Sequence, residues 1–166
     1  MSSVPTDPNT GPSTGSAASS DVSSPGTSNV GIAAAEAGAA RPASTPFELL
    51  GGESGVRALV ERFYDLMDLE PAYAGIRRLH PNTLDGSRDK LHWYLCGWLG
   101  GPNHYIERFG HPRLRARHLP YAIGIAERDQ WMACMVQALG EEQVATGLAG
   151  RLAEAFFGTA DWMRNR

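Results

Sequence analysis

Apolar residues recur at helical spacing along the chain beyond residue 45, and no run shows a convincing strand pattern. The clearest stripe lies in residues 55–69, where one helix face would carry Val56, Leu59, Val60, Phe63 and Met67. Similar patterns predict helices over 46–52, 71–81, 87–101, 125–140 and 141–163. Because each apolar stripe has to be buried against another element, we expect an all-α domain of four main helices and several short ones.

The first 44 residues have a different composition. They contain no aromatic residue, and their only charged side chains are those of Asp7, Asp21, Glu36 and Arg41. Such a segment cannot bury enough apolar surface to offset the entropy lost on ordering. We therefore predict a disordered tail over 1–44, rich in Ser, Pro, Gly and Ala, before a folded domain over 45–166. A solvated extension is favoured over a role in binding a partner.

The charge, the length of the apolar runs and the cysteine content argue against a nucleic-acid-binding protein, a membrane-spanning protein and a redox-active cysteine protein. The formal net charge of -3 does not indicate nucleic-acid binding. The longest apolar runs are far shorter than the roughly 20 residues of a membrane span. The two cysteines, Cys96 and Cys134, lack CxxC spacing and lie on apolar helical faces, so we expect core packing and not redox chemistry. A reducing, cytoplasmic compartment fits this content.

The segment "RLRARHLPYAIGIAERDQW" (113–131) places His118 at the end of a run of arginines and before a proline. None of the five histidines has the HxH or HExxH spacing of common metal sites. A single histidine beside arginines and many aromatic residues suits a flat, apolar cofactor with two carboxylates, such as haem. The residues alone leave two alternatives open, a haem protein and a haem-free helical module that binds other proteins.

Four segments resemble the motifs of the group II truncated haemoglobins. They are "ERFYDLM" (61–67), "WLGGPNHY" (98–105), "FGHPRLRARHLPYAI" (109–123) and "ERDQWMACM" (127–135). The resemblance covers the predicted folded domain and none of the tail. It implies a shortened globin fold, in which helices stack two over two around haem b.

The resemblance also implies roles for particular residues. His118 matches the proximal ligand of the iron, and Arg117 and Lys90 match residues that pair with the haem propionates. Tyr64 and Trp131 match donors on the ligand-binding side, where His80 stands in place of the more usual tyrosine or phenylalanine. The remaining expected haem contacts are Phe63, Leu91, Tyr94, Tyr105, Tyr121 and Ile123.

The function implied by the resemblance is reversible binding of O2 or another diatomic ligand, NO or CO. Two hydrogen-bond donors beside the ligand predict slow release, which suits redox chemistry or sensing better than bulk oxygen transport. Nitric oxide oxidation and peroxidase-like turnover are both compatible with these residues, and the sequence does not choose between them. The expected partners are the gas ligand and an electron-donating reductase, and the expected state is a monomer or a homodimer.

Overall fold

The computed structural model describes residues 44–166, and those residues form helices and loops with no strand. The tail predicted for 1–44 lies outside the described residues, apart from Ser44. The elements are α1 Pro46–Leu49, α2 Gly52–Leu69, the 3-10 turn η1 Pro71–Tyr73, α3 Ala74–Arg77, α4 Asp85–Trp98, α5 His104–Phe109, α6 Leu114–His118, α7 Ile125–Glu141 and α8 Thr146–Met163. The prediction of an all-α domain with four main helices is confirmed.

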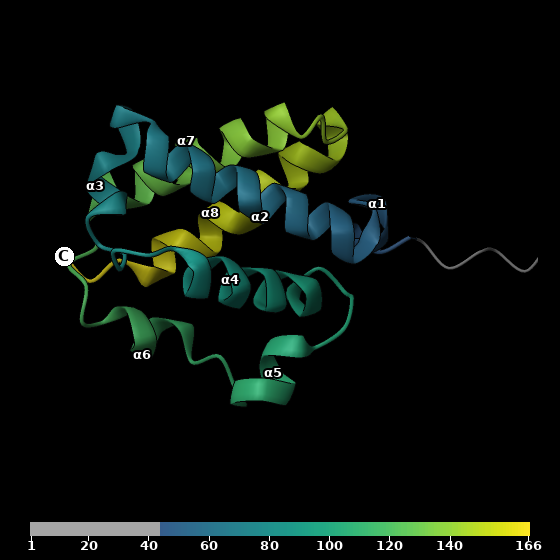
Figure 1. Ribbon diagram of the computed structural model, residues 1–166, viewed down its shortest axis with the longest axis horizontal. Coiled ribbons are helices and arrows are strands. Elements are labelled where there is room, and N and C mark those ends of the chain that lie inside the picture. Colours follow the sequence, from purple (N-terminus) through teal and green to yellow (C-terminus); the bar gives the residue numbers. More distant parts are fainter. Residues whose placement is uncertain (1–43) are drawn as a thin grey trace, which may run out of the picture. The chain divides into compact units, whose positions relative to one another are not determined.

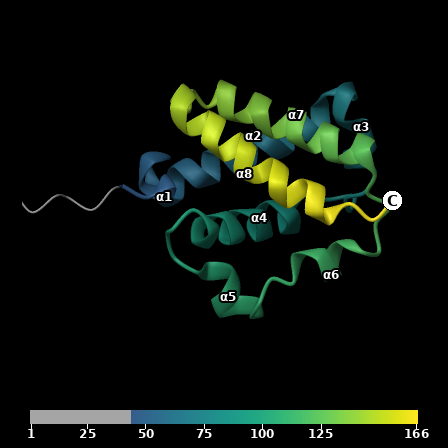
Figure 2. The ribbon, with the colours of Figure 1, turned by 180° about the vertical axis from the view of Figure 1, so that it is seen from behind.

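Two antiparallel helix pairs make up the body of this domain. Helices α2 and α4 run in opposite directions and pack together, as do α7 and α8, and α2 also packs against α7 (Figure 1). This is the arrangement of two helices over two that the resemblance implies. The short helices α5 and α6 lie on the far side of α4 from α2, and both views place them there (Figure 2).

The apolar core lies between the long helices. The stripe predicted for α2 is buried, and Phe63 and Val60 have no exposed surface. Cys96 and Cys134 are free thiols with no exposed surface, as expected for core packing. In the described part of the chain, no residue of α5 or α6 belongs to this core cluster.

Helix ends explain where the structure departs from the predicted ranges. The last helix does not begin at residue 141, because Gln143 has a left-handed φ of 54° and interrupts the chain between α7 and α8. The N–H of Val144 donates to the carbonyl of Leu139 and that of Gln143 to the carbonyl of Gly140. This is the double hydrogen bond of a Schellman motif, with glutamine at the position where glycine is usual.

The end of α4 has the same motif with the usual residue. Gly100 has a φ of 95°, and the N–H of Gly101 donates to the carbonyl of Cys96 over 2.8 Å. The chain therefore turns sharply after α4 and leads into α5, which begins the segment that carries His118.

Candidate haem pocket

His118 lies in the last turn of α6 and is half-buried. Its Nδ1 donates a hydrogen bond to the carbonyl of Leu114 over 2.7 Å. This bond fixes the tautomer and the plane of the ring, so the lone pair of Nε2 is left available for a metal ion. Its own helix would therefore orient His118 to hold a metal ion through Nε2.

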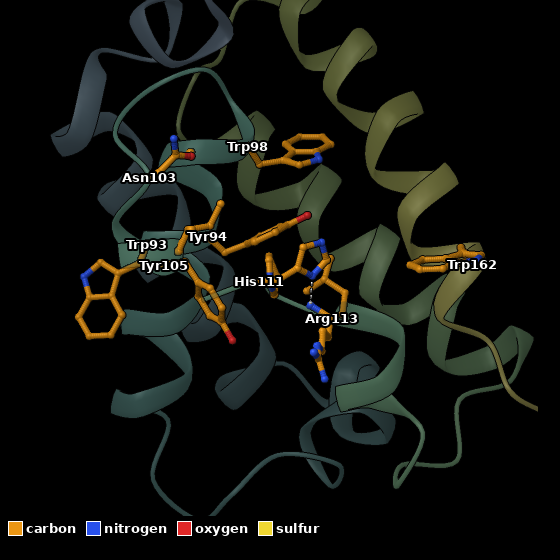
Figure 3. Close-up of a pocket in the computed structure, with 12 residues that line it drawn as sticks. Trp93, Tyr94, Trp98, Asn103, Tyr105, His111, Arg113 and Trp162 are labelled. Atoms are coloured by element: carbon orange, nitrogen blue, oxygen red, sulfur yellow. Dashed lines mark hydrogen bonds between the residues drawn. The ribbon is translucent and has the colours of Figure 1, made fainter. Parts of the chain in front are cut away.

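A cavity of about 410 Å³ lies beside α6. Its walls come from α4, α5, the loop before α6, and α8, and the labelled residues are drawn in Figure 3. Leu114 is one of the lining residues and His118 lies four positions later, so the two side chains share one face of α6. The lining is mostly apolar and aromatic: Trp93, Tyr94, Gly97, Trp98, Asn103, Tyr105, Ile106, His111, Pro112, Arg113, Leu114 and Trp162.

A second group of aromatic side chains surrounds Tyr64 on α2. Tyr64 contacts Phe63 edge to face with ring centroids 5.0 Å apart, and the Phe63 ring lies 5.3 Å from that of Trp131. Trp131 in turn contacts Phe156, which stacks on Trp98 at 4.9 Å. Since Trp98 lines the cavity, this series of ring contacts links Tyr64 to the cavity lining, although Tyr64 and Trp131 do not line the cavity themselves.

The hydroxyl of Tyr64 remains protonated. Burial raises the pKa of Tyr64 well above its ordinary value, while Ser87 and the positive charge of Arg88 act in the opposite direction. Arg88 is held beside the ring by ion pairs with Glu61 and Asp65. Tyr64 can therefore donate a hydrogen bond over the whole physiological pH range.

His80 resembles His118 in its local geometry. Its Nδ1 donates to the carbonyl of Ile76 over 2.9 Å, again four residues earlier in the chain. Burial lowers the pKa of His80, the bond to Ile76 opposes that effect, and the charges of Arg77 and His118 lower the pKa further.

Comparison with known proteins identifies the class to which this arrangement belongs. The sequence profile of the family described as bacterial-like globin matches residues 45–165. The chain belongs to this family. The resemblance to truncated haemoglobins is thereby confirmed, and the globin family implies a haem cofactor and diatomic gas ligands.

Individual relatives of this globin are group II truncated haemoglobins. Group 2 truncated hemoglobin YjbI of Bacillus subtilis (strain 168) is 36% identical over 115 residues, which are 69% of this chain and 81% of the relative. A group II 2-on-2 hemoglobin from the plant pathogen Agrobacterium tumefaciens has a TM-score of 0.73 and 42% identity, covering 76% of this chain and 98% of that one.

A cold-adapted truncated hemoglobin from the Antarctic marine bacterium Pseudoalteromonas haloplanktis TAC125 gives similar values. Its TM-score is 0.72 and its identity is 41%, with 74% of this chain and 99% of that chain covered. None of the helices within residues 44–166 of our globin combines the length and apolar character needed to cross a membrane.

The residues expected to contact the haem ring fall into three sets in this globin. Tyr94 and Tyr105 line the cavity, and their rings lie 6.2 Å apart at nearly a right angle. Phe63 and Leu91 pack in or against the core, beside the cluster around Tyr64. Tyr121 and Ile123 lie in the loop after α6, and Tyr121 is 44% exposed.

Basic side chains surround the segment that carries His118. Within residues 44–166, Arg113, Arg115 and Arg117 form no ion pair, so their charges are not neutralised by carboxylates of the protein. The Nε of Arg117 donates to the carbonyl of Pro112 over 3.0 Å. Lys90 is exposed on α4. A cofactor with two carboxylates would therefore meet uncompensated positive charge here.

Several cavity residues were not among the sequence predictions. His111 and Arg113 line the cavity together, and the backbone N–H of Arg113 donates to Nδ1 of His111 over 3.1 Å (Figure 3). Trp162 reaches the cavity from the end of α8. The only sequence feature that could have indicated His111 and Arg113 as cavity residues is their position just before the segment of His118. No local sequence pattern indicates that Trp162 lies near that segment.

Proposed function

We propose that this globin binds haem b against the apolar cavity, with Nε2 of His118 as the protein ligand of the iron. The observation that carries the proposal is the bond between His118 Nδ1 and the carbonyl of Leu114, because it leaves Nε2 available on the same helix face as a cavity-lining residue. The aromatic lining would contact the ring, and Arg117, Lys90 and the newly identified Arg113 would hold its carboxylates.

Bound haem supplies an iron that takes a diatomic ligand and exchanges electrons. We infer that Tyr64 and Trp131 are the donors that this chain directs at such a ligand. The raised pKa of Tyr64 keeps its proton available, and the indole N–H of tryptophan is always a donor. Hydrogen bonds to a partly charged acceptor contribute about 1.5–3 kcal/mol each, so two donors favour slow release of O2.

The role of His80 depends on its protonation. With Nδ1 donating to Ile76, the neutral ring presents Nε2 as an acceptor or a metal ligand, and it becomes a donor at Nε2 only after protonation. Because burial lowers the pKa of His80, we infer that the ring is neutral at physiological pH. Tyr64 and Trp131 are then the donors under ordinary conditions, and His80 joins them in acid.

Slow release and donors that persist at neutral pH support a role in O2 or NO redox chemistry, peroxidase-like turnover or sensing, and argue against bulk oxygen transport. An electron-donating reductase would be required for repeated turnover. The buried free thiols of Cys96 and Cys134 are compatible with the reducing cytoplasm that we propose as the location. Membership of the globin family favours this function over a haem-free interaction module.

Absorption spectra of the purified full chain test the proposal. We expect a Soret band in the ferric, ferrous and CO-bound states, and a weak or absent band in His118→Ala. His111→Ala is the matched control: it removes the histidine that lines the cavity, and we expect this variant to retain haem. A colourless wild-type chain would contradict haem binding. Normal haem content in His118→Ala would contradict the ligand assignment alone. The ferric and ferrous spectra also report whether His80 or Tyr64 binds the iron when no gas is present.

A further inference from the structure

The helix that carries His118 is weakly attached to the core. None of the five residues of α6 is buried, and the loop that follows it is largely exposed. Apolar packing therefore does little to hold this segment in place. Something else must fix the position of His118 if the ring is to meet a cofactor in one orientation.

The side chain of Asn165, two residues beyond α8, bonds to three points of this segment. Its Nδ2 donates to the carbonyl of His118 over 3.2 Å and to that of Tyr121 over 2.9 Å. Its Oδ1 accepts the backbone N–H of Ile123 over 3.2 Å. One amide group thus fixes the backbone at three positions, His118, Tyr121 and Ile123.

Backbone bonds reinforce the same contact. The N–H groups of Asn165 and Arg166 both donate to the carbonyl of Ile123, over 2.9 and 3.2 Å. From α6, Nη1 of Arg115 donates to the carbonyls of Trp162 and Arg164. We call these contacts between residues 162–166 and residues 115–123 the C-terminal clasp.

The clasp is itself anchored to the body of the domain. Asp161 accepts hydrogen bonds from Arg164 over 2.8 Å and from Arg128, which lies in the first turns of α7. The end of α8 is therefore tied to a long core helix before it reaches α6. This connection ties the clasp to α7, so that α6, which has no buried residue of its own, is linked through it to a long helix of the core.

We propose that Asn165 is a positioning residue for His118, and that the C-terminal clasp holds α6 so that the imidazole meets the haem iron in one orientation and haem leaves slowly. The inference rests on the proposed function. It assigns residues 162–166 a role in the cofactor site that neither the expected site residues nor the family comparison contains. The amide of asparagine is required because it donates and accepts at once, whereas a carboxylate of the same shape could keep only the bond from Ile123 and would repel two carbonyls.

Asn165→Asp is the decisive variant, because it removes the donor and preserves shape. Asn82→Asp is the matched control, since it adds the same charge at an exposed asparagine in the loop before α4. Three properties are compared: the iron–histidine stretching vibration of the ferrous protein by resonance Raman, the rate of haem transfer to an excess of a haem-free acceptor globin, and amide hydrogen exchange of the apo-protein. Arg115→Met, with Arg151→Met as its control, tests the clasp at a second point.

We expect a shifted iron–histidine vibration and haem loss about tenfold faster in Asn165→Asp, as two hydrogen bonds of ordinary net strength are lost. Exchange should accelerate at residues 118–125 of the apo-protein and remain unchanged in α2 and α7. An unchanged iron–histidine vibration and an unchanged rate of haem loss overturn the proposal, and so does a general loss of protection from exchange without a shift in the vibration.

A wild-type chain that takes up no haem defeats the proposed function. In that case the exchange data alone decide whether Asn165 positions this segment, with local acceleration supporting the clasp and its absence overturning it.

Discussion

Tyr64 on α2 and His80 in the turn after α3 meet edge to face, with ring centroids 5.7 Å apart and ring planes inclined by 79°. Their hydrogen-bonding characters differ at neutral pH. Tyr64 retains its proton because burial raises its pKa, whereas His80 lacks a proton on Nε2 because burial lowers its own. Tyr64 therefore donates a hydrogen bond at every physiological pH, whereas His80 donates from Nε2 only when it is protonated. Variants of Tyr64 should act at all pH values, and variants of His80 should change the pH dependence.

Removing the hydroxyl of Tyr64 should speed O2 release. Tyr64→Phe keeps the ring contact with Phe63 and removes the donor, so we expect the O2 dissociation rate constant to rise about tenfold to a hundredfold. Stopped-flow displacement by CO measures it. Tyr73→Phe is the matched control, because the hydroxyl of Tyr73 donates to Gln137 over 2.6 Å, away from the cluster around Tyr64. Equal rates in Tyr64→Phe and the wild type would exclude the donor role.

Trp131→Phe should also speed O2 release, by about tenfold, because phenylalanine preserves an aromatic contact with Phe63 and Phe156 but has no N–H. The double variant with Tyr64→Phe shows whether the two donors act together. Two donors on one ligand should give an effect that departs from the sum of the single free-energy changes. If Trp131→Phe releases O2 at the wild-type rate, the indole has no part in ligand binding.

The O2 dissociation rate should depend on pH through His80. As pH falls below about 6.5, the ordinary pKa of histidine, protonation gives His80 a second N–H, and dissociation should slow. The transition lies below 6.5 because burial lowers the pKa of His80. His80→Phe should abolish this dependence while His111→Phe retains it. A pH profile that persists in His80→Phe would assign the effect to another group.

Gln143→Gly should stabilise the protein. Gln143 has a left-handed backbone at the end of α7, a conformation that costs an ordinary residue about 1 kcal/mol relative to glycine. We expect the free energy of unfolding of the apo-protein, measured in urea, to rise by about 0.5–1 kcal/mol. Gly100→Ala should have the opposite sign, because its φ is 95° and a Cβ there would lie 3.1 Å from Cβ of Thr45. A destabilised Gln143→Gly would mean that the side chain makes a contribution larger than the backbone strain.

The long helices could be predicted because each carries an apolar stripe that its own residues display, as in Val56, Val60 and Phe63 of α2. The break between α7 and α8 was predicted near residue 140, but the linker over 142–145 was not, because its turn uses Gln143 where a glycine would signal the end of a helix. The helix predicted over 87–101 ends within a few residues of the end of α4 at Trp98, where Gly100 and Gly101 form the turn.

Some residues of the candidate site could be predicted from the sequence and others could not. His118, Tyr64 and Trp131 were predicted because motifs around them resemble a known family, and their roles stay predictions until the experiments above are done. Asn165 was not predicted, because its contacts join residues more than 40 positions apart and an asparagine near a chain end has no local pattern. His111 and Arg113 lie in a loop, where periodicity gives no information.

The absence of α5 and α6 from the core cluster has a consequence for how this chain is made. The four long helices can collapse around their shared apolar interior with no help from the segment that carries His118. Folding of the long helices and binding of haem would then be separate steps. We expect the haem-free chain to form a compact helical body before the segment that carries His118 is ordered by the cofactor.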